Sequence, residues 1–134
     1  MRSRVLVVED DPQMLGYLAG LLESWGYDVR RAGSATAAVE SVRESCPNII
    51  LSDLLLPGMD GVELLRQLRT TSPCAEKQPP ATCFPLFILL TGQTSVSSAV
   101  RAIMEGADEV LVKPLDEVRL LTLLQNYEAQ SKLA

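Results

Sequence analysis

Short apolar runs alternate five times along the chain with segments of helical periodicity, and this alternation restricts the fold more than any other feature. The apolar runs cover residues 5–8, 27–32, 48–52, 86–90 and 109–112, and the second run is the weakest. Continuous runs rich in Val, Ile and Leu are typical of strands buried on both faces of a parallel sheet. The pattern therefore predicts one parallel sheet with helices on both faces, joined by right-handed crossovers.

The segments between and after these runs carry apolar residues at helical spacing. They cover residues 12–25, 35–44, 62–68, 96–104 and 116 onward. Asp11 and Ser34 are the expected N-caps of the first two helices, and Pro12 suits the first helical position. Gly26 is the expected left-handed stop of the first helix.

Two stretches lack this periodicity and are predicted to be loops. Residues 54–60 form a loop closed by two turn-forming pairs, Pro57-Gly58 and Asp60-Gly61. Residues 70–85 are polar, contain four prolines and are expected to form a long exposed loop. A tolerated surface insertion explains this loop more simply than a partner-specific contact does.

The length of 134 residues and a composition of 47% hydrophobic and 22% charged residues are typical of one globular domain. No apolar run approaches the roughly 20 residues of a membrane helix, and residues 5–8 are too short for a signal peptide. We therefore expect a cytoplasmic protein that does not bind membranes. The net charge of −5 argues against a nucleic-acid-binding surface on this chain.

The chain contains three cysteines and no histidine. The absence of histidine excludes zinc sites of mixed Cys/His type and also excludes a histidine phosphodonor within this chain. Cys46, which precedes Pro47, is expected to be a small buried thiol. Cys74 and Cys83 lie in one predicted loop and could pair with each other, but this pairing is disfavoured because disulfides are scarce in cytosolic proteins.

Polar side chains gather where four of the predicted strands end. Glu9 and Asp10 follow the first strand, Asp53 the third, Thr91 the fourth and Lys113 the fifth. The carboxyl ends of parallel strands meet at one edge of the sheet, where ligands bind. Carboxylates so close to one another favour a hard cation, and Mg²⁺ suits a site of oxygen ligands. Asp53 could then act as a nucleophile that forms an acyl phosphate.

Each of these residues also has a simpler interpretation when it is taken alone. The acidic run could be a solvated helix entry, and for Asp11 the N-cap role is the preferred explanation. Thr91 could cap the next helix, and Lys113 could be a surface lysine. Only the conjunction of these groups at one edge favours a phosphoryl-transfer site.

Four segments in register resemble the receiver domain of response regulators in two-component signalling. They are VVEDDP at residues 7–12, DLLLPGMDG at 53–61, LTG at 90–92 and VKP at 112–114. The resemblance implies an α/β, flavodoxin-like doubly wound (βα)5 sandwich with strand order 2-1-3-4-5. It also implies a single receiver domain over residues 1–134, with a core from about residue 4 to 128 and no output domain in this chain.

The resemblance implies that Asp53 is the phosphoacceptor. Glu9 and Asp10 match the acidic pair of the family. Together with Asp53 and the backbone carbonyl of Leu55, they are expected to hold Mg²⁺, with Mn²⁺ as a substitute.

The remaining matches concern the phosphoryl contacts and the switch. Thr91 matches the switch hydroxyl, followed by Gly92, and Lys113 matches the lysine that pairs with the acceptor and its phosphate. The Lys113–Pro114 bond is expected to be cis. Val110 departs from the family, which usually has Tyr or Phe at that position, so a switch based on an aromatic side chain is not expected.

Two further departures lie beside the expected path of an attacking water. Leu55 stands two residues after the acceptor, and Gln93 stands two residues after Thr91. We hypothesise that apolar Leu55 fails to orient the water and so slows loss of the phosphoryl group. Leu115 also replaces a frequent Phe.

The leading interpretation is a phosphorylation-controlled interaction module and not an enzyme that releases a product. Its implied partners are a histidine kinase or histidine phosphotransfer protein, within a phosphorelay or simple two-component system, and an output domain or protein downstream. The leucine-rich last helix predicts a homodimer or partner surface on the last two helices.

The main alternative is a receiver fold that serves as a constitutive interaction platform with vestigial phosphorylation. A haloacid-dehalogenase-type phosphatase would need an Asp where Leu55 stands. A flavodoxin-like FMN carrier is disfavoured because the first loop is acidic and would repel phosphate.

Overall fold

The computed structural model of the chain describes residues 3–71, 85–92, 101, 103–104 and 106–133. Its five strands are all parallel and form one sheet in the predicted order β2-β1-β3-β4-β5. They are β1 (Arg4–Val8), β2 (Asp28–Ala32), β3 (Ile49–Asp53), β4 (Leu86–Thr91) and β5 (Glu109–Val112). Within the described ranges, no helix combines the length and the apolar character that a membrane crossing requires.

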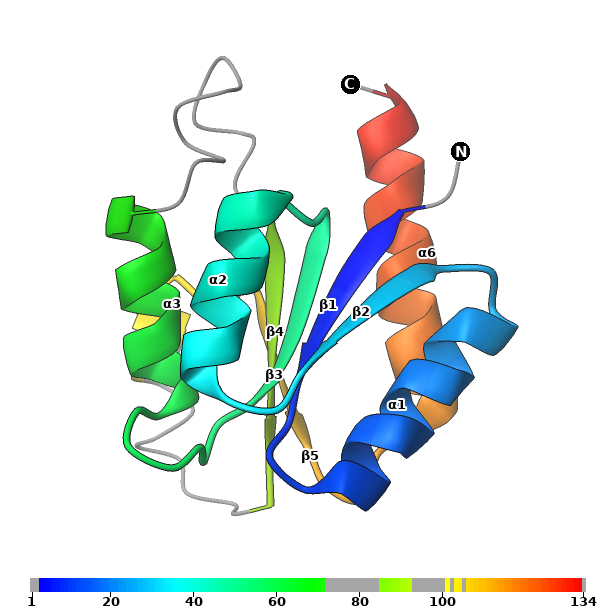
Figure 1. Ribbon diagram of the computed structural model, residues 1–134. Coiled ribbons are helices and arrows are strands. Elements are labelled where there is room, and N and C mark those ends of the chain that lie inside the picture. Colours follow the sequence, from blue (N-terminus) through cyan, green and yellow to red (C-terminus); the bar gives the residue numbers. More distant parts are fainter. Residues whose placement is uncertain (1–2, 72–84, 93–100, 102, 105, 134) are drawn as a thin grey trace.

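Helices cover both faces of this sheet. They are α1 (Pro12–Ser24), α2 (Ala35–Glu44), α3 (Gly61–Thr71) and α6 (Glu117–Leu133). Figure 1 shows α1 and α6 on one face of the sheet and α2 and α3 on the other. This three-layer arrangement confirms the predicted doubly wound sandwich. Most of the helix predicted over residues 96–104 lies outside the described residues.

Side chains that alternate along the strands form two apolar clusters, one on each face of the sheet. Leu6, Ile50 and Phe87 pack with residues of α2 and α3. Val7 and Leu51 point to the opposite face and pack with residues of α1 and α6. Because helices cover both faces, successive strand residues must all be apolar, which explains the continuous apolar runs in the sequence.

The predicted helix signals take the expected geometry. The Asp11 side chain accepts a hydrogen bond from the Gln13 amide at 3.1 Å, and Ser34 Oγ accepts one from the Ala37 amide at 3.1 Å. Gly26, just after α1, has a φ of 93°, a left-handed conformation that glycine adopts without a steric penalty. Each cap contributes about 0.5–2 kcal/mol to stability, so these residues fix where α1 and α2 begin.

The structure corrects two details on this side of the sheet. α3 continues through Thr71, so the loop predicted to start at residue 70 starts later than expected. The physical reason is that the first helix-breaking residue after the start of α3 is Pro73. Residues 72–84 of that loop lie outside the described residues. Cys46 is only partly buried and is disulfide-bonded, whereas the sequence predicted a buried thiol. Its bonding partner lies outside the described residues.

The leucines of the last helix mostly serve the core of this chain. Leu120 and Leu124 are buried, and Leu123 packs against the cluster between α1, α6 and the sheet. Val118 is 73% exposed on the same helix. The richness in leucine therefore does not by itself require a second subunit, and the homodimer stays a prediction.

Candidate functional site

Two neighbouring strands place acidic side chains together at the carboxyl edge of the sheet. β1 and β3 pair in parallel with Val8 opposite Ser52, so the next residues, Glu9 and Asp53, lie side by side. The Glu9 amide continues the ladder by donating to the Ala32 carbonyl at 3.1 Å. The strand register therefore holds both residues in a fixed position.

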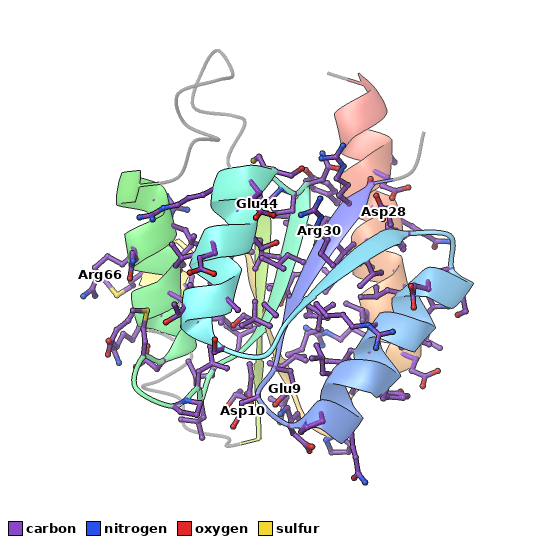
Figure 2. All side chains as sticks on the ribbon, in the orientation of Figure 1. Glu9, Asp10, Asp28, Arg30, Glu44 and Arg66 are labelled. Carbon is purple, nitrogen blue, oxygen red and sulfur yellow. The ribbon has the colours of Figure 1, made fainter. Side chains whose placement is uncertain are left out.

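Glu9, Asp10 and Asp53 form a cluster in which one carboxylate oxygen of each lies within 4.8 Å of the others. Glu9 is only 2% exposed and Asp53 only 8%, whereas Asp10 faces solvent. Figure 2 places Glu9 and Asp10 at the end of β1, beside the entry to α1. The structure thus brings together the three carboxylates predicted from the sequence. Asp11 is used as the N-cap, as predicted.

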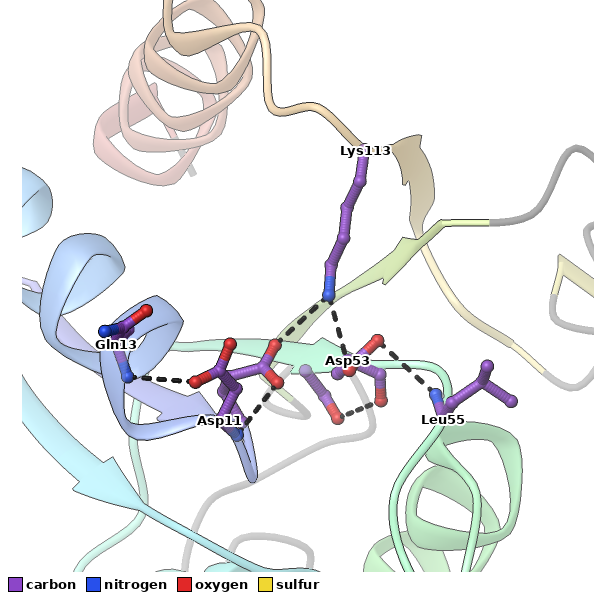
Figure 3. Close-up of polar contacts among 7 residues, drawn as sticks. Asp11, Gln13, Asp53, Leu55 and Lys113 are labelled. Carbon is purple, nitrogen blue, oxygen red and sulfur yellow. Dashed lines mark hydrogen bonds and ion pairs between the residues drawn. The ribbon is translucent and has the colours of Figure 1, made fainter.

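Lys113, which directly follows the edge strand β5, also reaches this cluster. Its amide donates to the Thr91 carbonyl at 2.7 Å, which fixes the backbone just after β5. Its Nζ atom lies 3.3 Å from Glu9 Oε2 and 3.4 Å from Asp53 Oδ2 (Figure 3). The Lys113–Pro114 peptide bond is cis, as expected. One ammonium group therefore bridges two carboxylates from different strands.

Burial and charge act on these groups in opposite directions. Burial raises the pKa of Glu9 by disfavouring its charged form, and the charge of Asp53 adds to this, while the Asp11 amide and Lys113 oppose it. Burial alone would lower the pKa of Lys113, but the carboxylates of Asp53 and Glu9 outweigh it, and the pKa is raised. Lys113 therefore stays charged at neutral pH and offsets only part of the negative charge around it.

The loop after β3 orients the Asp53 carboxylate. The Leu55 amide donates to Asp53 Oδ1 at 3.4 Å, while Oδ2 faces Lys113. The side chain of Leu55 is 59% exposed beside the acceptor (Figure 3). Ser52, which is fully buried, donates to the Asp53 carbonyl at 2.9 Å. One carboxylate oxygen is thus held by a backbone amide and the other by an ammonium group.

Gly61 supports this loop for a reason that the sequence did not reveal. The sequence indicated only a turn at Asp60-Gly61, but Gly61 begins α3 and packs against the acceptor backbone. A Cβ atom at this position would lie 2.6 Å from Leu89 Cδ2 and 2.7 Å from the Asp53 carbonyl oxygen. The Gly61 amide also donates to the Leu54 carbonyl at 2.7 Å. The absence of a side chain is therefore what allows α3 to lie close to Asp53.

The predicted switch residues lie on the two strands beyond Asp53. Thr91 ends β4, is 4% exposed and follows Leu90, which pairs with Asp53; Gly92 comes next and is exposed. Val110 is partly buried in β5 and packs against the cluster on the α2 and α3 face. The position that usually carries an aromatic switch residue is thus taken by a small aliphatic side chain within a packed layer.

The chemistry of the donor set indicates which ion the cluster can hold. Three carboxylates converge with one ammonium group, so negative charge is in excess at the edge of the sheet. All three candidate ligands are hard oxygen donors, and no described Cys lies among them. This set fits Mg²⁺ or Mn²⁺ and does not fit a thiolate-preferring metal.

Comparison with known proteins agrees with this geometry. The profile of the response regulator receiver domain matches residues 5–125. The transcriptional regulatory protein ZraR of Klebsiella oxytoca is 35% identical over 130 residues, which cover 97% of this chain and 27% of ZraR. The DNA-binding response regulator MtrA of Mycolicibacterium smegmatis is 34% identical over 121 residues, covering 90% of this chain and 48% of MtrA. The chain thus spans about half or less of the length of these relatives.

Solved structures show the same similarity over the whole fold. A response regulator receiver domain protein from Clostridium thermocellum has a TM-score of 0.83 and 28% identity, with 98% of both chains covered. The receiver domain of a histidine kinase from Syntrophus aciditrophicus has a TM-score of 0.76 and 32% identity, covering 92% of this chain and 88% of that one.

The fold and the matches to known proteins define a regulatory domain of the receiver class. The chain belongs to the response regulator receiver domain family. It is therefore a regulatory domain of two-component signalling.

Proposed function

We propose that Asp53 accepts a phosphoryl group from a phosphohistidine of a partner protein, and that this modification changes which proteins the domain binds. The observation that carries the proposal is the bridge of Lys113 Nζ to Asp53 and Glu9 at 3.4 and 3.3 Å, beside three clustered carboxylates. A structural ion pair needs one carboxylate. The additional acidic groups fit a site that binds a cation and a phosphoryl group together.

Asp53 is the proposed nucleophile because it occupies the acceptor position of the segment that resembles the receiver family, at the end of the central strand β3, where its carboxylate contacts Lys113 and the Leu55 amide. An Asp53 oxygen would form the O–P bond while the N–P bond of the donor breaks, and the imidazole would leave with the bonding electron pair. Lys113 would stabilise the charge of the phosphoryl oxygens, and Thr91, with Gly92 beside it, would then bind one of them. The buried position of Thr91 next to the strand of the acceptor supports this role.

Glu9, Asp10 and Asp53, with the backbone carbonyl of Leu55, are the proposed ligands of Mg²⁺, and Mn²⁺ would substitute. When bound, the ion would neutralise charge on the carboxylates and the phosphoryl oxygens. The oxygen-only donor set and its spacing within 4.8 Å support this assignment. Glu9 and Asp10 would otherwise repel an incoming phosphoryl group, so their own role is to create a site that requires the cation.

The phosphodonor is proposed to be a histidine kinase or a histidine phosphotransfer protein, since this chain has no histidine of its own. Side chains beside the acidic edge support docking there: Tyr17 is 43% exposed and Val118 is 73% exposed. The Tyr17 hydroxyl donates to the Glu117 carboxylate and so links α1 to the start of α6. This surface would receive the partner, while the output domain or protein would recognise the phosphorylated form. The predicted lack of direct nucleic-acid binding rests on the net charge of −5.

A constitutive platform with vestigial phosphorylation is the alternative, and one observation favours it. Val110 packs into the cluster on the α2 and α3 face, so there is no aromatic side chain at this position to report on Thr91. The intact carboxylate cluster and its lysine argue against this alternative, because their mutual repulsion would serve no purpose in a passive scaffold.

The deciding experiment measures the intact mass of the protein after incubation with Mg²⁺ and acetyl phosphate. We expect one added phosphoryl group on the wild type and on Asp11→Asn, which removes a neighbouring charge but preserves the N-cap. We expect none on Asp53→Asn or in the presence of a chelator. Labelling that persists in Asp53→Asn would refute the assignment of the acceptor.

If the wild type stays unlabelled while a control receiver is labelled, beryllofluoride separates the remaining explanations. Binding of beryllofluoride would show a competent site that needs a specific protein donor. Its failure to bind would favour the constitutive platform.

A further inference from the structure

A pocket of about 230 Å³ lies at the edge of the sheet opposite the phosphorylation site. Ser3 and Tyr27, which line it, directly precede β1 and β2, so the pocket lies at the amino ends of these parallel strands. Trp25 closes it from the end of α1, and Gln125 and Glu128 line it from α6. Figure 1 shows this end of α6 near the start of β1, far from the acidic edge.

The walls of this pocket combine two aromatic rings with a fixed carboxylate. Tyr27 is only 7% exposed, and its side chain makes a hydrogen bond with Glu128. Burial raises the pKa of the Tyr27 hydroxyl, and Glu128 raises it further, so the hydroxyl stays protonated and donates to the carboxylate. The partly buried Trp25 lies along the same pocket. The hydrogen bond from Tyr27 therefore orients the Glu128 carboxylate, which can still accept further hydrogen bonds.

No cationic side chain is present among the described residues that line the pocket. The described arginines that lie nearest in sequence to the residues lining the pocket all interact with other side chains. Arg4 donates to Ser45 Oγ, and the other three lie beside carboxylates: Arg30 is 3.5 Å from Glu44, Arg31 is 3.4 Å from Glu23, and Arg119 is 3.5 Å from Glu109. The negative charge of Glu128 thus has no described positive partner inside the pocket.

We propose that this pocket binds the cationic head of an alkylammonium or guanidinium ligand, with Glu128 as the charged acceptor and the rings of Trp25 and Tyr27 as the walls. A carboxylate forms its strongest hydrogen bonds with such donors, and aromatic faces attract cations. The volume is below the range of pockets for drug-sized ligands and suits a head group with a short alkyl chain. This binding would be independent of the phosphoacceptor chemistry.

The chain provides its own reporter for a test, because Trp25 is its single tryptophan and lines the pocket. The wild-type protein is titrated with n-butylammonium while Trp25 fluorescence is recorded, and n-butanol serves as the uncharged ligand of the same chain length. We expect a saturable change with the cation only. In Glu128→Gln the dissociation constant should rise about tenfold to a hundredfold, because a charged hydrogen bond is lost while the partner for Tyr27 is kept.

Matched variants separate this site from general charge effects. Glu44→Gln removes the same charge from an exposed position on α2 and should leave the affinity unchanged. Gln125→Lys places an ammonium group on the wall of the pocket and should block the ligand. This second variant changes an exposed residue, so it still tests the proposal if Glu128→Gln folds poorly. Comparing n-butylammonium with N-acetyl-lysine methylamide then distinguishes a free amine from the side chain of a partner protein.

Two results would overturn the proposal. They are the absence of saturation with any cation and an equal loss of affinity in Glu128→Gln and Glu44→Gln.

Discussion

Gly61→Ala offers a sharp test of how closely α3 is packed against the acceptor strand. The new Cβ atom would lie 2.6 Å from Leu89 Cδ2, 2.7 Å from the Asp53 carbonyl oxygen and 3.1 Å from Leu54 Cα. Non-bonded carbon atoms prefer separations of about 3.5–4.0 Å, so the overlap with Leu89 is about 1 Å. Leu89 is fully buried and the other two atoms belong to the backbone, so none of the three can simply swing away.

The expected cost follows from this geometry. Overpacking of a filled core costs about 1–3 kcal/mol, and we expect Gly61→Ala to lower the free energy of unfolding by that amount. Relief of the overlap must move the Asp53 backbone or the start of α3. A displacement of about 1 Å at a reacting group can slow a reaction about a hundredfold. Phosphorylation by acetyl phosphate should therefore slow markedly even in protein that remains folded.

Gly20→Ala is the matched control for this substitution. Apart from its chain neighbours and the backbone of its own helix, no heavy atom lies within 4 Å of the Cβ position at Gly20, which is exposed in the middle of α1. Alanine should stabilise the helix there by about 0.5–1 kcal/mol. Urea unfolding followed by circular dichroism gives both stabilities, and intact mass against time gives the phosphorylation rates. The reasoning is refuted if Gly61→Ala is as stable as the wild type, or if both alanines destabilise the protein alike.

Three further predictions address the acceptor loop, the pocket at the amino edge and a helix cap. Leu55→Asn should speed loss of the phosphoryl group, measured as the decay of the intact-mass adduct; a decay in the wild type as fast as or faster than in the variant would contradict this. The pKa of the Tyr27 hydroxyl is raised in the folded state. The protonated hydroxyl therefore stabilises the fold fully at pH values below the unfolded-state pKa of about 10, and this stabilisation is lost as the pH rises toward the folded-state pKa. Urea unfolding between about pH 9 and 11 should therefore show a steeper loss of stability in the wild type than in Tyr27→Phe, and equal slopes would contradict this. Asp11→Ala should lower the free energy of unfolding by about 0.5–2 kcal/mol, whereas Asp11→Asn should change it little.

Much of the fold follows from local patterns in the sequence. The apolar runs and the caps at Asp11 and Ser34 are read from neighbouring residues, and the five strands and the helices α1, α2, α3 and α6 lie where these patterns predict; the helix expected over residues 96–104 stays a prediction. The end of α3 was less well predicted, because the polar residues before Pro73 carry no periodic signal and a helix can continue through them. The disulfide at Cys46 was also missed, since spacing along the chain does not show which sulfur atoms meet.

The candidate site was predictable in its members but not in its contacts. Each acidic residue follows a strand, and parallel strands end at the same edge, so the convergence of Glu9 and Asp53 follows from topology. The sequence did not indicate that Lys113 would contact Glu9 as well as Asp53. It also gave no sign that Gly61 is needed because of a close contact and not because of a turn.

The sequence by itself determined the class of fold, the order of the elements and the residues at the acidic edge, because these depend on periodicity and on where each strand ends. Only the tertiary structure decided which distant groups meet. Lys113 and Glu9 are separated by 104 positions in the chain, and Trp25 and Glu128 by a similar stretch, yet each pair belongs to one site. The physical reason is that such contacts depend on strand register and helix packing, which are set by the whole core and not by any local segment.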